Sequence, residues 1–355
     1  MRFRSNNNYA ACLIAALAAC NATRLHGQQV LVNFNVPGPA DWDVPGNWDP
    51  ANRPEAGFDE VAVIGGGRSA FVASAVPNTG GIIMDLSTLE IRSGGSLVVE
   101  PGPSTPNNGN ITLGQSLNTN LIVRRGGSLT ARNISSGGGP ATELLLGETG
   151  GSGTATLSVT GGTLNRNTRI VGPNVAFSSS GSLAFGGQHR LAPVITGATH
   201  STINVTGSAT LAGTVRPEFS GYTPVLGNSW DLVTAGSLTS TMTLDTSGLP
   251  ILPRGTAFNL SATGTTAKLG YNNFLILSVN RGTGVARIEN AVGSAIGFDG
   301  YTITSPSGAL GGTWNSLQDQ AIAGWDEADN STANRRTEFK TSGLTSLAAG
   351  NSVSL

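Results

Sequence analysis

The sequence predicts an all-β protein: a parallel β-helix, or β-solenoid, with an N-terminal cap before it and a small C-terminal β-sandwich after it. Three observations support this fold class. Glycine accounts for 50 of the 355 residues, which is about twice its average usage. Apolar residues recur in short i, i+2 pairs, the period of a strand with one buried face. A glycine-containing phrase also returns along the middle of the chain at a narrow spacing.

The overall charge excludes two classes of partner. The formal net charge is −1, and charged residues make up only 12 % of the chain. Binding to nucleic acid requires a basic face that neutralises phosphates, and attraction to anionic lipid requires a basic cluster. The sequence therefore predicts no nucleic-acid partner and no electrostatic membrane binding.

Residues 1–27 have the pattern of a signal peptide. Arg2 and Arg4 provide a positive start, and a short apolar run follows from Tyr9 to Ala19. This run is shorter than the roughly 20 residues that span a bilayer. Cleavage could follow Ala22 or Gly27. We expect a protein that is secreted or held at the cell surface, and no later stretch is apolar enough to predict a transmembrane segment.

The second cysteine of the leader leaves two interpretations open. The chain's two cysteines, Cys12 and Cys20, both lie in the leader, so the rest of the chain has no disulfide framework. Residues 17–20, Leu-Ala-Ala-Cys, resemble the lipobox of bacterial lipoproteins, which implies a lipid anchor on Cys20. The alternative is that Cys20 is one small apolar residue of the leader.

A repeated phrase defines the predicted solenoid. It reads Gly-Gly-Ser-Leu at residues 94–97 and 126–129 and Gly-Gly-Thr-Leu at residues 161–164. One leucine per phrase gives steps of 16, 16, 17, 18 and 19 residues along the set Leu97, Leu113, Leu129, Leu146, Leu164 and Leu183. A narrow repeat of this kind indicates stacked units that bury their apolar faces against one another.

We therefore predict that each of these steps is one rung of a solenoid between residues 82 and 215, with a β cap at 28–81 and a closing β segment at 216–279. An antiparallel sandwich of hairpins is the alternative, but two-residue hairpin signals such as Asn-Gly are scarce in the repeat. Trp42 and Trp48 are expected to cover the open edge of the first rung.

Three segments carry a family resemblance. Residues 144–164 (LLLGETGGSGTATLSVTGGTL) resemble the glycine-rich, autotransporter-like repeats of exported planctomycete proteins. Residues 41–67 resemble the caps that precede such repeats, and residues 221–242 resemble the segment that closes them. The resemblance implies an architecture much more than an activity.

The glycine-paced repeat ends before residue 280, and a different pattern of strands and turns follows. Residues 280–355 contain alternating strand patterns separated by Thr-Gly, Asp-Gly and Pro-Ser-Gly turns. This segment resembles a C-terminal β-sandwich module of planctomycete exported proteins. We expect it to form a second, small domain.

The repeat contains few groups that could catalyse a reaction. Polysaccharide lyases and hydrolases need clustered carboxylates, but no aspartate lies between Ser87 and Trp230. The glutamates there are Glu90, Glu100, Glu143, Glu148 and Glu218. Glu143 and Glu148 are interpreted as solvated turn residues, His189 and His200 match no zinc spacing, and no catalytic residue is predicted.

Two acidic clusters are candidate calcium sites. Asp41, Asp43 and Asp49 lie close together in the predicted cap, and Asp326 and Asp329 lie in a C-terminal loop. Carboxylate oxygens are the ligands that calcium prefers, but neither cluster has the spacing of an EF-hand. Plain turn residues are the alternative, and no other cofactor is predicted.

Two tryptophans of the last domain are candidate ligand-binding residues. Exposed aromatic rings can lie against sugar rings, and Trp314 and Trp325 are the aromatic residues placed for this role. Packing inside the domain is the alternative interpretation of both residues.

The sequence favours a non-enzymatic, secreted or surface-displayed protein of structural or adhesion type. In this interpretation the solenoid is a spacer for the end domain, and a matrix-binding or polysaccharide-binding face lies on that domain. The alternative is a carbohydrate-binding protein or a degenerate β-helix polysaccharide lyase or hydrolase. Convergent carboxylates on the solenoid would favour the alternative, and a smooth Thr and Asn surface would favour the structural role.

Overall fold

The computed structural model describes residues 29–105, 108–114, 116–137, 139–328 and 331–355. The predicted leader, with Cys20, lies outside these residues. The described chain is built from strands, with two short 3-10 turns at Pro45–Asn47 (η2) and Ala56–Phe58 (η3). It forms two compact units, the first from residues 29–223, 230–249 and 260–268 and the second from residues 224–229, 250–259 and 269–355.

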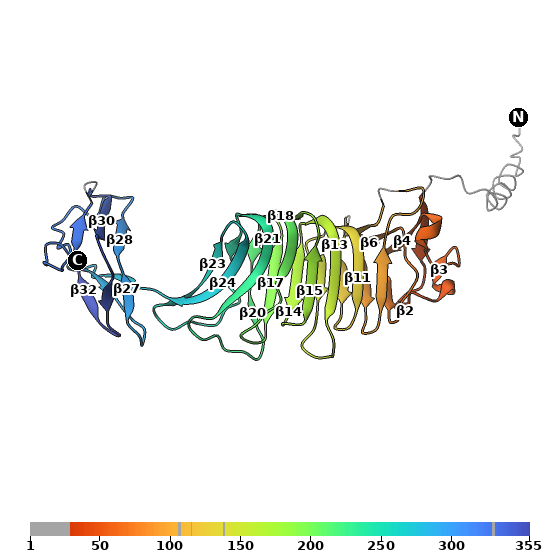
Figure 1. Ribbon diagram of the computed structural model, residues 1–355, viewed down its shortest axis with the longest axis horizontal. Helices are drawn as coiled ribbons and strands as arrows, with labels where there is room; N and C mark the ends of the chain where they lie inside the picture. Colours follow the sequence, from red (N-terminus) through yellow and green to blue (C-terminus); the bar gives the residue numbers. More distant parts are fainter. Residues whose placement is uncertain (1–28, 106–107, 115, 138, 329–330) are drawn as a thin grey trace, which may run out of the picture. The chain divides into compact units, whose positions relative to one another are not determined.

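Two long sheets, sheet A and sheet B, contain the strands of the first unit, and the last two strands of sheet A, β24 and β23, belong partly to the second unit (Figure 1). Sheet A contains β1 (Val30–Phe34), β3 (Trp48–Asp49), β4 (Glu60–Gly65), β6 (Gly81–Asp85), β8 (Ser96–Val99), β9 (Asn110–Leu113), β11 (Ser128–Ser136), β13 (Ala155–Leu164), β15 (Val175–Ser179), β16 (Leu183–Phe185), β18 (Ile203–Leu211), β21 (Ser229–Ser240), β24 (Thr266–Asn273) and β23 (Thr256–Ala262). Sheet B contains β2 (Pro39–Asp41), β5 (Ser69–Val72), β7 (Ser87–Ile91), β10 (Thr119–Val123), β12 (Glu143–Leu146), β14 (Asn167–Val171), β17 (Arg190–Ile195), β19 (Thr214–Val215), β20 (Glu218–Phe219) and β22 (Thr243–Leu244).

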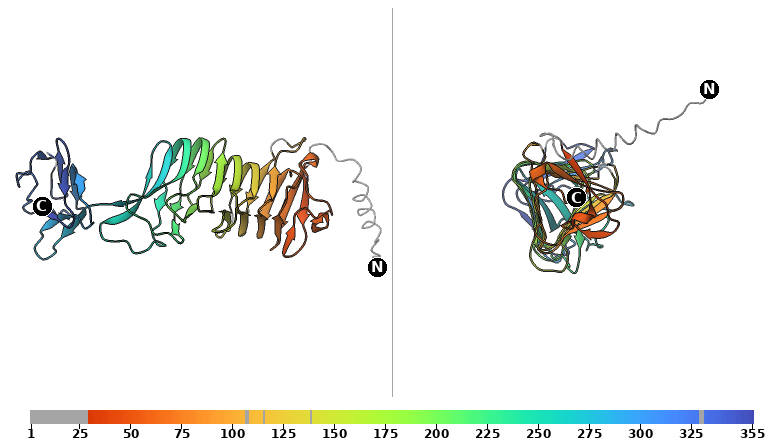
Figure 2. Two further views of the ribbon diagram at one scale, coloured as in Figure 1. Left: turned by 60° about the horizontal axis from the view of Figure 1, so that its bottom comes forward. Right: turned by 90° about the vertical axis from the view of Figure 1, so that its right-hand side faces the viewer.

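Strands from successive passes of the chain pair in parallel, as the prediction of an all-β solenoid requires. In sheet B, β10 pairs with β12, β12 with β14 and β14 with β17, all in parallel. In sheet A, the first half of β11 pairs with β8 and its second half with β9. One coil therefore has three straight segments, one in sheet B and two in sheet A. Figure 2 shows the coils overlying one another when viewed along the stack.

The predicted rung length was wrong, because one coil is longer than one step of the leucine phrase. In sheet B, Leu121 is opposite Leu144, and Leu144 is opposite Thr168. In sheet A, Leu97 pairs directly with Leu129, so two of the predicted rungs fit into one coil. The leucine phrase misled because it recurs on different sides of the same coil: Leu113 lies in the second segment of sheet A.

Parallel stacking also extends beyond residues 82–215. β1 pairs in parallel with β4, and β2 with β5, inside the segment predicted as a cap. At the other end β21 pairs in parallel with β18, inside the predicted closing segment. A cap-like feature is β3, which runs antiparallel to β1 at the end of sheet A. Trp42 and Trp48 are buried there, with ring centroids 4.7 Å apart.

Inward side chains of successive coils form the core of the first unit. One row in sheet A contains Leu129, Leu157, Phe177 and Ile203, which are paired in register and fully buried. The bend between the two segments of β13 depends on Gly162, whose φ is +155°. A Cβ at this position would collide with the carbonyl oxygen of Ile134 in the preceding coil. The close approach of coils therefore requires glycine at this corner.

The second unit contains three small antiparallel sheets. They are β25 (Ile276–Val279), β26 (Ala286–Glu289) and β32 (Ser352–Ser354); β27 (Ile296–Phe298) and β31 (Thr345–Leu347); and β28 (Gly300–Thr304), β30 (Arg335–Lys340) and β29 (Trp325–Glu327). Their shared core is Ile288, Phe298, Leu317 and Trp325. Nothing in the described part of either unit is a helix of the length and apolarity needed to cross a membrane.

Candidate binding groove on sheet B

The predicted calcium ligands of the N-terminal region do not come together. Asp41 accepts a hydrogen bond from the backbone N–H of Asp43, and Asp43 pairs with Arg53 at 2.6 Å. Asp49 is exposed. The described residues contain no group of three acidic, His or Cys side chains arranged to hold a metal ion. Calcium binding by these residues stays a prediction without geometric support.

The predicted ligand-binding and calcium-binding residues of the C-terminal region differ in their exposure to solvent. Trp325 is 3 % exposed, and its indole N–H donates to Thr345 Oγ1 at 2.8 Å, so its ring has no face left for a ligand. Trp314 is half-buried and lies 5.3 Å from the guanidinium carbon of Arg336. Asp326 is exposed, and Asp329 lies outside the described residues.

His189 belongs to the core. Its ring stacks on Phe185 with centroids 4.0 Å apart, and its Nε2 lies 3.0 Å from Thr168 Oγ1. Burial lowers the pKa of His189 to about 3, so the ring is neutral at ordinary pH. The structure therefore places His189 among the packed side chains inside the coil.

A hollow of about 430 Å³ lies on the outer face of sheet B. Leu145, Val171 and Val194 provide its apolar floor, and Thr149 and Ser220 add hydroxyl groups to the lining. Charged and aromatic side chains make up the rest of the lining, namely Arg124, Glu143, Glu148, Arg169, Glu218 and Phe219. We call this set of residues the sheet-B groove.

Strand alternation places these side chains outside. In β12, Leu144 and Leu146 are buried, so Glu143 and Leu145 point to the other face. In β14, Thr168 and Ile170 are buried, which turns Arg169 outward. Because the strands are parallel and in register, Leu145 and Arg169 are direct neighbours across the sheet.

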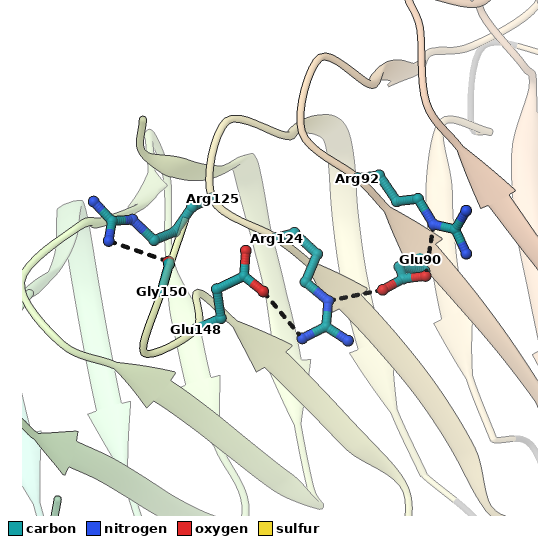
Figure 3. Close-up of polar contacts among 6 residues, drawn as sticks. All are labelled: Glu90, Arg92, Arg124, Arg125, Glu148 and Gly150. Carbon is teal, nitrogen blue, oxygen red and sulfur yellow. Dashed lines mark hydrogen bonds and ion pairs between the residues drawn. The ribbon is translucent and has the colours of Figure 1, made fainter. Parts of the chain in front are cut away.

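One side of the groove is a chain of ion pairs that crosses three coils (Figure 3). Glu90 accepts from Arg92 at 2.9 Å and from Arg124 at 2.7 Å. Arg124 also reaches Glu148 at 3.4 Å. Burial raises the pKa of Glu90, but the hydrogen bonds from Arg124 and Arg92 outweigh it and hold the pKa below its usual value. Glu90 is therefore ionised at neutral pH.

A loop at residues 147–154 forms the wall beside Glu148. Arg125 holds it by donating to the carbonyl oxygens of Gly150 at 3.2 Å and Gly153 at 3.1 Å. The contact to Gly150 is visible in Figure 3. These bonds fix the loop on the preceding coil, so the wall is built before any ligand arrives.

A second ion pair crosses the other end of the groove. Arg169 in β14 donates to Glu218 in β20 at 2.7 Å. The guanidinium crosses β17, in which Ala192 is the residue paired with Arg169 across the sheet. A small side chain at this position leaves room for the crossing.

The arrangement suits hydrogen bonding more than charge attraction. The three glutamates and two arginines of the groove give a formal charge of −1. Glu148 and Glu218 face arginines, whereas the Glu143 carboxylate has no ion pair or hydrogen bond with the described part of the chain. Arginines held in ion pairs keep unused N–H donors, and carboxylates keep unused lone pairs.

The sequence predicts turn positions for Glu143 and Glu148, but Glu143 lies in β12, and no local pattern connects either residue with Glu218. The alternation of apolar residues predicts which side chains of a strand point outward. It does not predict that Glu143 and Glu218, which are far apart in the sequence, line the same groove. The signal that could have found it is the coil length, which brings β12, β14 and β20 onto one face.

Sheet A carries a different outer surface. A smaller hollow of about 340 Å³ is lined there by hydroxyl groups of Thr130, Ser158, Thr160, Ser178 and Thr206, among others. The sequence predicts a smooth Thr and Asn surface for a structural solenoid, whereas Ser and Thr line this hollow. On sheet B three carboxylates line one hollow, as the alternative predicts.

Comparison with known proteins adds no relative: no family model, curated protein or solved structure matches the chain.

Proposed function

We propose that the chain is an exported structural protein of adhesion type, without enzymatic activity, in which the solenoid is a stiff platform. The observation that carries this proposal is the ladder of parallel coils with an apolar interior. Each coil contacts its neighbours on both sides, so the stack gains rigidity and length by repetition.

The ends complete the proposal. β3 and the buried pair Trp42 and Trp48 act as an N-terminal cap that protects the first coil. The small antiparallel sheets of the second unit form a β-sandwich that the solenoid presents to the surroundings. Residues 1–27 direct export, and mass spectrometry of the mature protein tests the anchor: a lipidated Cys20 supports attachment, and an unmodified start at Thr23 or Gln28 supports free secretion.

Removing one coil tests the platform role. Excision of residues 144–167 joins Glu143 to Thr168, which is the residue that faces Leu144 across the sheet. Every later residue then keeps its inward or outward orientation. The shortened protein should be exported, fold cooperatively and still present a C-terminal epitope tag on the cell surface or in the medium.

The control excision differs by one residue. Removing residues 145–167 instead places Arg169 in the inward position of Leu146, because side chains alternate along the strand. This variant should fail to fold. Equal tolerance of both excisions, or intracellular retention of the parent, would show that the proposal is wrong.

The converging glutamates of the sheet-B groove favour a second candidate, a β-helix enzyme acting on polysaccharides. Incubation with uronic-acid and neutral polymers, followed by assays for new reducing ends and unsaturated products, tests it. Cleavage that is abolished in Glu143→Gln or Glu148→Gln would replace the non-enzymatic proposal.

A further inference from the structure

We propose that the sheet-B groove binds a segment of an uncharged polysaccharide. This rests on the adhesion role proposed above, because it names the ligand through which the solenoid would adhere. The inference moves the binding face from the second unit to the solenoid itself.

The floor of the groove fits the apolar side of a sugar ring. Leu145 and the aromatic ring of Phe219 are half-buried and provide most of the accessible apolar surface of the lining. Val171 and Val194 are 6 % and 3 % exposed and add little to it. A sugar ring has C–H groups on its faces and hydroxyl groups at its edge, so an apolar floor with a polar rim matches both.

The rim provides fixed donors and acceptors for hydroxyl groups. Arg169 and Glu218 hold each other at 2.7 Å, and Arg124 is held between Glu90 and Glu148. Side chains positioned in this way lose little conformational entropy when a ligand binds. Glu143 adds a carboxylate with both oxygens available for neighbouring hydroxyl groups.

The charge balance selects an uncharged polymer. The five ionised groups of the groove sum to −1, and both arginines already face carboxylates. A polyanion such as a uronate chain would meet Glu143 without an unpaired cation in the groove to compensate. A polycation could pair with Glu143 alone, because Glu148 and Glu218 already face Arg124 and Arg169.

The geometry favours a repeating polymer over a peptide. The lining residues lie on or directly beside five neighbouring strands, β10, β12, β14, β17 and β20, which at about 4.8 Å per interval span about 19 Å. An extended peptide is recognised most readily by addition to a sheet edge. Here the hollow lies on the face of the sheet, where the backbone groups are already used in the parallel ladder.

The test is affinity electrophoresis of the purified full chain in gels that contain one soluble polysaccharide each. The panel includes a β-glucan, a mannan and a xylan as uncharged polymers, polygalacturonate as a polyanion and chitosan as a polycation. We expect retardation by at least one uncharged polymer. The affinity for that polymer should be at least tenfold lower in Glu143→Ala than in the parent. It should be lowered equally in the double variant Arg169→Gln with Glu218→Gln, which removes both partners of one ion pair.

The matched control is Glu100→Ala, which removes an exposed carboxylate elsewhere and should bind like the parent. Unfolding midpoints of all variants confirm that the fold is kept. The proposal is overturned if no uncharged polymer retards the chain, if the groove variants bind like the parent, or if charged polymers alone bind. Selection of a peptide from a display library through Glu143, without polysaccharide binding, also overturns it.

This outcome is independent of the coil-excision experiment. If the chain binds no polysaccharide but is exported and tolerates excision of one coil, the groove proposal is wrong and the platform role stands. If the purified chain binds polysaccharide but the protein is not exported, the platform role is wrong and the groove proposal stands.

Discussion

The outer faces of sheets A and B differ although both stand on the same parallel backbone ladder. On sheet A, a row of Thr130, Ser158, Ser178, Asn204 and Thr234 runs across five coils with hydroxyl or amide groups outward. On sheet B, the outward side chains include glutamates and arginines that pair across coils. Inward side chains are predominantly apolar in both sheets, so the interior determines the coil and the exterior is free to differ.

The interiors also differ in one detail. The row of sheet A that contains Leu157, Phe177 and Ile203 is entirely apolar, whereas sheet B places Thr168 between Leu144 and Leu191. Thr168 is paired with His189 inside the coil. A polar pair in the core makes stability on the sheet-B side sensitive to protonation, which the sheet-A row is not.

The largest expected effect comes from the interior of sheet A. Phe177→Ala removes a ring that is 1 % exposed and packed between the coils before and after it. Such a truncation leaves a cavity and should lower the free energy of unfolding by about 3–5 kcal/mol. Chemical denaturation measures it, and Ser178→Ala, the outward neighbour, should change it by less than about 0.5 kcal/mol. Similar losses in both variants would contradict the division into inner and outer faces.

The next effect concerns the corner that only sheet A contains. Gly162→Ala places a Cβ against the carbonyl oxygen of Ile134 and strains a backbone with φ of +155°. We expect a loss of about 3 kcal/mol in unfolding free energy. Gly187→Ala is the control, because a Cβ there meets nothing within 4 Å. If Gly162→Ala is as stable as Gly187→Ala, close packing of the coils at this bend is not required.

A pH effect should arise from the sheet-B interior. Burial lowers the pKa of His189 from 6.5 to about 3, so between these values the unfolded chain binds a proton that the folded chain does not. This contribution to stability is complete above pH 6.5 and is lost as the pH falls toward 3. We expect a loss of about 2 kcal/mol between pH 7.5 and pH 5.

Urea titrations at these two pH values measure the effect. His189→Leu should remove this part of the pH dependence, since no group remains at the site to take up the proton. The same pH-dependent loss in parent and variant would show that other groups cause it.

The smallest effect should come from the exterior of sheet B. Arg124→Ala removes the ion pairs with Glu90 and Glu148, which are partly exposed to solvent. The expected cost is about 1 kcal/mol, and it should shrink in 1 M salt because screening weakens such pairs. Lys268→Ala removes one more exposed pair, with Asp231, and serves as the comparison. A cost of Arg124→Ala that is unchanged by salt would indicate lost packing instead of lost charge pairing.

The sequence by itself determined the strand content and the direction of most side chains. Alternating apolar residues in segments such as 97–99, 111–113 and 121–123 gave strands whose buried faces match the structure. These features depend on neighbours at alternate positions, and a local pattern records them. The glycine corners were also readable, because a bend between strands favours a residue without a side chain.

Only the tertiary structure decided the coil length, the extent of the stack and the groove. Coil length depends on which strands pair, and the leucine phrase could not distinguish the three sides of one coil. The groove depends on the same pairing: Glu143 and Glu218 are distant in sequence but lie on one face of sheet B. A shared surface made by residues so far apart leaves no local pattern, since it exists only once the intervening coils have stacked.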